Sequence, residues 1–399
     1  MAEKFAINVY SEIGELKSVL LHRPGNELEN LSPDLLERLL FDDTPDLLVA
    51  QAEHDAFAKT LKENGIEVLY IEKLTEEVIT EKPELRNFLL EKFLEESGCD
   101  PKYLEKLKTY LQNLSNKDLV DKMIAGVTKH ELNVTMDDGY PLVVDPLPNI
   151  LFQRDPFASI GNGATINQMH TITRRRETLF IDIVLKNHSR FKDKVNFWYN
   201  RDEEGSVEGG DILVLNQKAL IIGVSQRTDL NAIKKIADRI INDNSIPYEK
   251  VIALDLKTKN RAFMHLDTVF TNVDYDKFIA HPLIFENINE FEIFEFTKEG
   301  MKKVDKKLEE YLSELVNKPV KFIKCGGEDP IAQAREQWND GTNVLTIKPG
   351  EVIAYSRNHI TVDKLKEAGI KVHEIASSEL SRGRGGPRCM SMPIWREDI

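Results

Sequence analysis

The sequence has fewer basic than acidic residues. It contains 53 Lys and Arg against 67 Asp and Glu, which gives a formal net charge of −14 over 399 residues. A negatively charged surface repels phosphate groups. The composition therefore predicts no nucleic-acid partner and no attachment to anionic membranes, and it favours a small cationic ligand.

Long apolar runs are also missing. The longest strongly apolar run is 219–224, far short of the roughly 20 residues that a membrane-spanning helix needs. Residues 1–12 lack the apolar stretch of a signal peptide. We therefore expect a cytoplasmic protein with no membrane partner. The 41% of hydrophobic residues is enough for a large core.

Cysteine is scarce, with one residue each at positions 99, 325 and 389. An odd number of widely separated cysteines argues against a disulfide framework, and no two of them stand at the spacing of a metal-binding pair. Each thiol therefore needs an explanation of its own.

Apolar runs of four to six residues, such as 18–21 and 212–215, alternate with stretches of helical periodicity. This alternation predicts an α/β fold. Residues 75–129 break the pattern, because they are rich in Glu and Lys with apolar residues at helical spacing, and Asp100 and Ser115 stand where helix N-caps are expected. We interpret this stretch as an all-helical insertion, although peripheral helices of the main domain would have the same composition.

Two pairs of similar segments indicate internal repeats. L-K-E-N-G-I-E-V at 61–68 resembles L-K-E-A-G-I-K-V at 365–372, and each predicts a helix that ends at a glycine before a strand. Segments 211–227 and 343–357 both read as strand, turn, strand, Ser and a basic residue, and a looser copy begins at Asp155. The pattern favours a ring of ββα-type units over a doubly wound sheet.

The segment S-R-G-R-G-G-P-R-C-M-S-M-P at 381–393 surrounds Cys389. Its glycines allow the tight turns that present a side chain to a cleft. Arg382, Arg384 and Arg388 predict a lowered pKa for the thiol, as a nucleophile requires. A buried, inert cysteine beside a basic tail is the alternative interpretation.

Several further polar residues suit the same chemistry. His265 and Asp267 stand two apart on a predicted strand, so they would face the same side. Glu208 and Asp211 flank a Gly-Gly pair, and Asp155 precedes a proline. Singly, these acids suit ordinary turns, and their spacing predicts no metal site. Together they describe a negatively charged pocket around a nucleophile.

A guanidinium group is the cation that such a pocket suits best. Its N–H groups pair with carboxylates in fork geometry, and its carbon needs a soft nucleophile such as a thiolate. A proton donor must also reach the departing nitrogen.

These motifs, with L-L-H-R-P-G at 20–25 and F-D-D-T-P at 41–45, resemble bacterial arginine deiminases of the guanidine-modifying superfamily over essentially the whole chain. The resemblance implies a five-fold pseudosymmetric α/β propeller of ββα-type repeats, formed by residues 1–72 and 141–399, with an all-helical insertion at 73–140. It implies hydrolysis of L-arginine to L-citrulline and ammonia without a metal or organic cofactor, and a homo-oligomer, a dimer or higher, as the working form.

Matching motifs also imply residue roles. Cys389 corresponds to the nucleophile that forms a covalent thiouronium, and His265 to the general acid and base. The carboxylates implied at the guanidinium are Asp155, Glu208 and Asp267. The residues implied to line the pocket or to hold the amino-acid end are Asn149, Phe152, Arg174, Asp211, Arg227 and Arg384. The sequence leaves open whether Arg174 or one of the two following arginines faces the substrate.

Other functions remain open at this point. Agmatine deiminase and dimethylarginine hydrolase use the same scaffold, but arginines reserved for a carboxylate would have no purpose with agmatine. An amidinotransferase would have to exclude water and admit an amine. A non-catalytic arginine-binding protein would not need the complete set of Cys, His and carboxylates.

Overall fold

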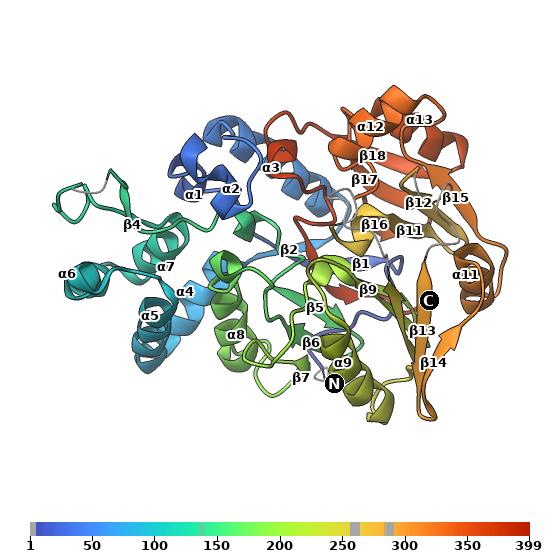
Figure 1. Ribbon diagram of the computed structural model, residues 1–399, viewed down its shortest axis with the longest axis horizontal. Coiled ribbons are helices and arrows are strands. Elements are labelled where there is room, and N and C mark those ends of the chain that lie inside the picture. The colour runs from blue at the N-terminus through green and yellow to red at the C-terminus, as the bar shows by residue number, and fades with distance from the viewer. Residues whose placement is uncertain (1–4, 137–138, 256–263, 283, 285–290) are drawn as a thin grey trace.

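The fold is α/β, as the sequence predicts, in a computed structural model that describes residues 5–136, 139–255, 264–282, 284 and 291–399 (Figure 1). Residues 137–138, near the end of the predicted insertion, lie outside the described residues. No helix in the described ranges is both long enough and apolar enough to cross a bilayer.

Five sheets share one three-strand arrangement. In each sheet two strands pair antiparallel, and the third strand pairs parallel with the central one. The three-strand groups, in order across each sheet, are β19 (Met392–Arg396), β1 (Leu16–Leu21) and β2 (Glu67–Tyr70); β5 (Phe157–Ile160), β6 (Gly163–Ile166) and β7 (Asn196–Tyr199); β8 (Ile212–Asn216), β9 (Ala219–Val224) and β10 (Lys250–Asp255); β11 (Phe270–Asp274), β12 (Lys277–Ala280) and β15 (Lys321–Lys324); β16 (Leu345–Lys348), β17 (Glu351–Tyr355) and β18 (Lys371–Ile375).

Two further strand pairs extend this framework. β13 (Glu292–Thr297) and β14 (Gly300–Val304) add to the edge of β10, and β3 (Val127–Thr128) pairs with β4 (Leu142–Val144).

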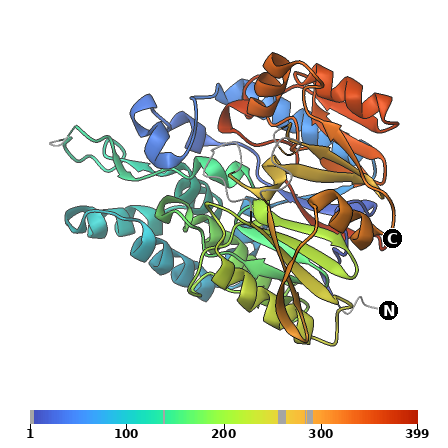
Figure 2. The same ribbon diagram turned by 45° about the vertical axis from the view of Figure 1, so that its right-hand side comes forward.

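A helix connects the two parallel strands of every three-strand group, because parallel strands need a long crossover connection. These helices are α3 (Leu47–Glu63), α8 (Glu177–Asn187), α9 (Leu230–Asn242), α11 (Leu308–Val316) and α13 (His359–Glu367). Figure 2 shows helices lying along the outer side of the strands. In α9 the buried face follows helical spacing, with Ile233, Ile236 and Ile240 fully enclosed.

The predicted repeat boundaries are confirmed. α3 and α13 each give way to a strand through a glycine in the left-handed region, with φ +76° at Gly65 and +82° at Gly369. The similar segments 211–227 and 343–357 form β8–β9 and β16–β17, and the looser copy at Asp155 precedes β5–β6.

Four consecutive helices occupy the predicted insertion: α4 (Ile71–Glu81), α5 (Pro83–Glu96), α6 (Pro101–Gln112) and α7 (Asn116–Ala125). Asp100 and Ser115 cap α6 and α7 as predicted, because their side chains accept backbone N–H bonds from Lys102 and Asp118. The four helices lie at the left of Figure 1. They share one hydrophobic core with α8 and β5–β7, so they do not form a separate core.

Short elements complete the described chain. The short α-helices are α1 (Asn26–Glu29), α2 (Leu36–Leu39) and α12 (Pro330–Trp338), and the 3-10 helices are η1 (Pro33–Leu35), η2 (Pro148–Leu151), η3 (Ile172–Arg174), η4 (Gly209–Asp211), η6 (Leu266–Thr268) and η7 (Leu380–Gly383).

Replacing Gly369 by alanine should lower the free energy of unfolding by about 1 kcal/mol, because an L side chain is strained at this φ. A Cβ there would meet no atom within 4 Å, so the effect isolates backbone strain. Urea unfolding of Gly369→Ala measures it, with the exposed Asp363→Ala on the same helix expected within about 0.5 kcal/mol of the parent. Equal stability of Gly369→Ala and the parent would contradict the left-handed assignment.

Candidate active site

The predicted site residues converge from distant segments. Asp155 precedes β5, and Glu208 precedes η4. His265 immediately precedes η6, and Asp267 lies within it. Cys389 lies in the loop between η7 and β19. All five residues are at least nine-tenths buried. Each therefore meets its neighbours in a low-dielectric environment, where charge interactions are strong.

The Gly-Gly pair after Glu208 permits this convergence. A Cβ on Gly210 would stand 2.7 Å from Nδ1 of His265 and 3.0 Å from Oδ1 of Asp155. The close backbone approach that the sequence suggested is therefore required by the packing of the imidazole.

The backbone of Cys389 is held on both sides. Its N–H donates to Oδ1 of Asn343 at 2.8 Å, and its carbonyl accepts the N–H of Arg154 at 3.0 Å. Gly386 packs directly against Asn343, so the turn has no room for a side chain there. These contacts fix the position of the thiol, and its Sγ lies 3.5 Å from Oδ2 of Asp267.

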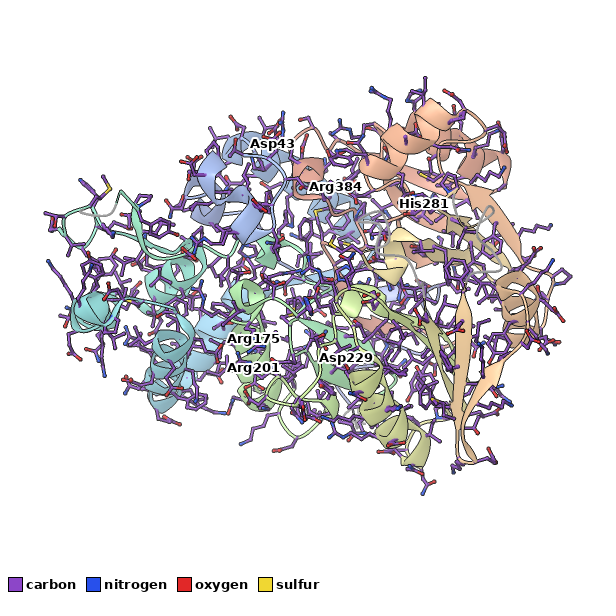
Figure 3. The ribbon with its side chains drawn as sticks, viewed as in Figure 1. Asp43, Arg175, Arg201, Asp229, His281 and Arg384 are labelled. Carbon is purple, nitrogen blue, oxygen red and sulfur yellow. The ribbon has the colours of Figure 1, made fainter. Side chains whose placement is uncertain are left out.

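The expectation that three nearby arginines lower the thiol pKa is wrong. Arg382 pairs with Asp43, and Arg384 stacks on the ring of Trp338 at 3.8 Å (Figure 3). Burial raises the pKa of the Cys389 thiol well above its ordinary value, and nearby carboxylates, Asp267 foremost, raise it further. The charge of Arg388 lowers the pKa of Cys389 but does not outweigh burial and these carboxylates.

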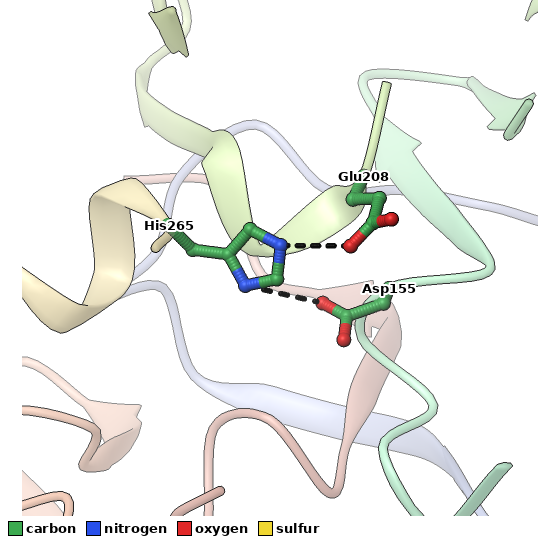
Figure 4. Close-up of side chains that lie close together, drawn as sticks. All are labelled: Asp155, Glu208 and His265. Carbon is green, nitrogen blue, oxygen red and sulfur yellow. Dashed lines mark hydrogen bonds and ion pairs between the residues drawn. The ribbon is translucent and has the colours of Figure 1, made fainter. Parts of the chain in front are cut away.

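His265 lies between two carboxylates (Figure 4). Its Nε2 is 2.9 Å from Oε2 of Glu208, and its Nδ1 is 4.0 Å from Oδ1 of Asp155. Burial opposes the imidazolium, but Asp155, Glu208 and Asp211 outweigh burial and raise the pKa of His265 to about 9. Burial raises the pKa of Glu208, but the bond and charge of His265, together with the charges of Arg174 and Arg227, outweigh burial and lower this pKa to about 2. The pair is therefore an imidazolium and a carboxylate at neutral pH.

The strand predicted for His265 and Asp267 is wrong. His265 is extended, but residues 266–268 turn into the 3-10 helix η6, and β11 begins only at Phe270. This turn directs the two side chains to different partners, Glu208 for His265 and Arg388 for Asp267.

Two buried carboxylate oxygens near the thiol lack a hydrogen-bond donor in the described part of the chain, and one of them belongs to Asp155, which lines the cleft. Oδ1 of Asp155 and Oδ1 of Asp267 have no hydrogen-bond partner among the described residues. Their other oxygens are occupied: Oδ2 of Asp155 by Nη1 of Arg174 at 2.8 Å, and Oδ2 of Asp267 by Nη1 of Arg388 at 2.8 Å. Buried acceptors without donors carry a free-energy cost that N–H groups of a ligand would remove.

Of the three consecutive arginines at 174–176, Arg174 lines the cleft that contains Cys389. Its Nε and Nη2 bind Glu177, and Nη1 binds Asp155, so every nitrogen of this buried guanidinium has a carboxylate partner. Arg175 and Arg176 line a different cavity. Of the three arginines, Arg174 is therefore the one that shares the cleft with Cys389.

The remaining predicted residues divide into two groups. Asn149, Phe152, Arg227 and Arg384 line the cleft with Arg174. Asp211 does not line it. Instead, Asp211 accepts bonds from Ser225 and Thr228 at 2.6 Å each and from the backbone of Leu266 at 2.9 Å, so it braces the turns behind His265.

The cleft has a volume of about 560 Å³. The lining residues that sequence reasoning did not assign to the site are Leu36, Glu37, Leu40, Phe41, Asp42, Gln226, Met264, Thr268 and Gly383. Phe41 and Asp42 belong to the F-D-D-T-P motif, which was the available signal, whereas the positions of the others depend on tertiary packing.

Asp155, Glu208 and His265 also offer ligand atoms within 4.8 Å of one another, a grouping that can hold a metal ion. Their spacing in the sequence gave no sign of it. Arg174 already supplies positive charge there, 2.8 Å from Asp155 and 3.8 Å from Glu208. This arrangement also suits proton transfer and cation binding.

Comparisons with known proteins agree with this chemistry. The family model described as arginine deiminase matches residues 37–396. The chain is 58% identical to an arginine deiminase of Mycoplasma capricolum, over 98% of each chain, and 50% identical to one of Clostridium perfringens over the full length of both.

Solved structures share the fold at low identity. SxtG, an amidinotransferase from Microseira wollei, has a TM-score of 0.60 at 13% identity, covering 99% of this chain and 98% of that one. DDAH from Pseudomonas aeruginosa complexed with citrulline has a TM-score of 0.54 at 16% identity, covering 95% and 99%. Sequence identity over the whole length, rather than this shared α/β fold, decides the family, and the chain belongs to the arginine deiminases.

Proposed function

We propose that the protein hydrolyses L-arginine to L-citrulline and ammonia, with Cys389 as the nucleophile. The observation that carries this proposal is the pair of buried, unpartnered oxygens on Asp155 and Asp267 in the same site as the thiol. A guanidinium supplies both the positive charge and the N–H groups that these oxygens lack. Relatives named arginine deiminase, at 46–58% identity, support it.

The substrate itself would activate the thiol. Asp267 and Asp155 raise the pKa of Cys389 because their negative charge opposes a thiolate. A bound guanidinium neutralises these carboxylates and places a positive charge beside Sγ. The thiolate therefore forms when a cationic substrate is present, which limits reactions of the thiol with other compounds.

Hydrolysis then proceeds in two steps. The thiolate adds to the guanidinium carbon, and His265, which carries its proton at neutral pH, protonates the departing ammonia. The resulting thiouronium on Cys389 is attacked by water as His265 takes back a proton, and collapse releases citrulline and the thiolate. Two easier steps replace one difficult displacement.

The amino-acid end of the substrate would meet Arg227 and Arg174. Arg227 lines the cleft with its Nη1 3.1 Å from Oγ1 of Thr171. Nη1 of Arg174 donates one N–H to Oδ2 of Asp155, which leaves Oδ1 for the substrate guanidinium and the second N–H of Nη1 for the substrate carboxylate. Arginine forks match carboxylates in geometry.

We also propose that the five similar sheets surround a pseudo-five-fold axis, so that the fold is an α/β propeller. The shared strand pattern of the five sheets supports this arrangement. The division into 1–72, the helical insertion 73–140 and 141–399, a cytoplasmic location and a homo-oligomeric state are further proposals, which rest on the sequence.

Replacing Cys389 by alanine should reduce citrulline formation at least about 1,000-fold, because the covalent step is lost. Arginine binding, measured by calorimetry, should persist, since the carboxylates remain. Cys99→Ala, which changes a half-buried thiol on the helical segment, is the matched control with full activity. Activity of Cys389→Ala within tenfold of the parent would show that the thiol is not the nucleophile.

Asp155→Asn and Glu208→Gln should each lower kcat/KM for arginine by at least ~100-fold, equivalent to ~3 kcal/mol, because each replaces a buried carboxylate with a group that presents N–H donors to a cation. Steady-state citrulline assays measure the loss, with the exposed Asp363→Asn as the charge-matched control. Losses below tenfold in both variants would place these acids outside the substrate site.

The pH dependence follows from the raised pKa of His265. A pKa of about 9 keeps the imidazolium protonated at neutral pH, so His265 should lose its proton only as the pH rises through about 9. NMR titration of the imidazole in Cys389→Ala should show this value, and adding Glu208→Gln should lower it, because a hydrogen-bonded carboxylate is removed. Titration near 6.5 in both proteins would contradict the coupled pair.

Agmatine, which lacks the α-carboxylate, should be a substrate poorer than arginine by several powers of ten, because it leaves the arginines at the far end of the cleft uncompensated. Arg227→Ala should depress kcat/KM for arginine strongly and change the agmatine value little. Side-by-side citrulline and carbamoylputrescine assays measure the ratio. Equal turnover of both substrates by the parent would favour agmatine deiminase instead.

A further inference from the structure

A second cavity, of about 640 Å³, is lined in part by residues adjacent in the chain to residues that line the catalytic cleft. Arg174 lines the cleft, whereas the next two residues, Arg175 and Arg176, line this second cavity. In α2, likewise, Glu37 lines the cleft and Arg38 lines the second cavity. With Arg201 the second cavity has four arginines in its lining, and we call it the arginine cavity.

Two of these arginines are neutralised and two are not. Arg38 pairs with Asp145 at 2.7 Å, and Arg201 pairs with Glu96 at 2.6 Å. Within the described ranges, no carboxylate lies at ion-pair distance from the other two, Arg175 and Arg176. Two more acids line the cavity, Glu95, which pairs with Lys92 at 2.7 Å, and Asp202. Figure 3 shows Arg175 and Arg201 at neighbouring positions.

The unneutralised arginines also have unused donors. Arg176 is only 4% exposed, and its Nη1 has no hydrogen-bond partner among the described residues. Nε of Arg175 and Oγ1 of Thr173 likewise have no hydrogen-bond partner among the described residues. Both residues also line the cavity. Three polar groups without a hydrogen-bond partner in the described part of the chain therefore lie within residues 173–176, on residues that line the cavity.

Burying a guanidinium without a counter-charge is costly. Burial lowers the pKa of Arg176 to about 10, although Asp145, Glu177 and Glu96 oppose the change. The N-terminus of α8 begins at Glu177, so the positive end of a helix dipole adds to the charge near the cavity. An anion with several oxygens would satisfy both the charge and the donors.

We propose that the arginine cavity binds a small oxyanion, through a phosphate or carboxylate group held by Arg175 and Arg176. Its lining includes residues 95–98 at the end of α5, residues 140, 143 and 145, and residues 172, 173, 175 and 176 before α8. A bound oxyanion would thus link the helical segment to the strand-bearing part of the chain. Its occupancy should raise the resistance of this junction to unfolding.

The test is calorimetric titration of the full chain with inorganic phosphate, pyrophosphate and malonate, paired with thermal unfolding at the same ligand concentrations. We expect saturable binding of at least one of these probes and a higher midpoint of unfolding. Binding of the phosphates alone identifies a phosphoryl ligand, and binding of malonate alone identifies a carboxylate ligand.

Two variants locate the binding. Arg175→Gln and Arg176→Lys should each weaken it at least about tenfold, because a charge-assisted hydrogen bond or the fork geometry is lost. Arg176→Lys keeps the buried charge, and Arg175 is more exposed, so at least one variant tests the site without unfolding the protein. Lys234→Gln on α9 is the charge-matched control, and Arg227→Gln removes an arginine of the catalytic cleft.

Binding should be unchanged in Lys234→Gln and Arg227→Gln. The proposal is overturned if no probe binds saturably to the parent. It is also overturned if Arg227→Gln loses binding while the two cavity variants keep it, since the anion would then occupy the catalytic cleft. Neither result depends on turnover of arginine.

Discussion

Compensation of buried negative charge is the constraint on which the site depends. Asp155, Glu208 and Asp267 are all at least 97% buried, close to a thiol. Such a group of carboxylates is stable only if positive charge and N–H donors reach it. Arg174, His265 and Arg388 supply part of this compensation, and a guanidinium substrate would supply the rest.

Arg388 extends this compensation to the scaffold. Its guanidinium binds Oδ2 of Asp267 on one side and both oxygens of Glu12 on the other, and its Nη2 donates to the carbonyl of Ile212. The side chain is 1% exposed. The residue before Cys389 therefore fixes the thiol loop to β8 and to the N-terminal segment, and its charge is already used in these bonds. This explains why its presence does not produce a low thiol pKa.

The sequence predicted those features that depend on local chemistry. The repeated segments, the glycines at 65 and 369 and the caps of α6 and α7 follow from short patterns, and the motif at 381–393 marked Cys389. Features that depend on long-range contacts were missed or wrong. The pairing of Glu12 with Arg388 joins residues 376 positions apart, and the thiol pKa depends on burial that no local pattern shows. The turn at η6, likewise, replaced a predicted strand because His265 must reach Glu208 while Asp267 reaches Arg388.

The most direct test of the account is rapid chemical quenching of the parent enzyme during turnover of arginine, followed by mass spectrometry of the intact protein and of its peptides. The account predicts a transient adduct with the mass of arginine minus ammonia, on the peptide that contains Cys389, formed and lost at rates compatible with turnover. Citrulline formation in a single turnover without this adduct, or with the adduct on another residue, would contradict it.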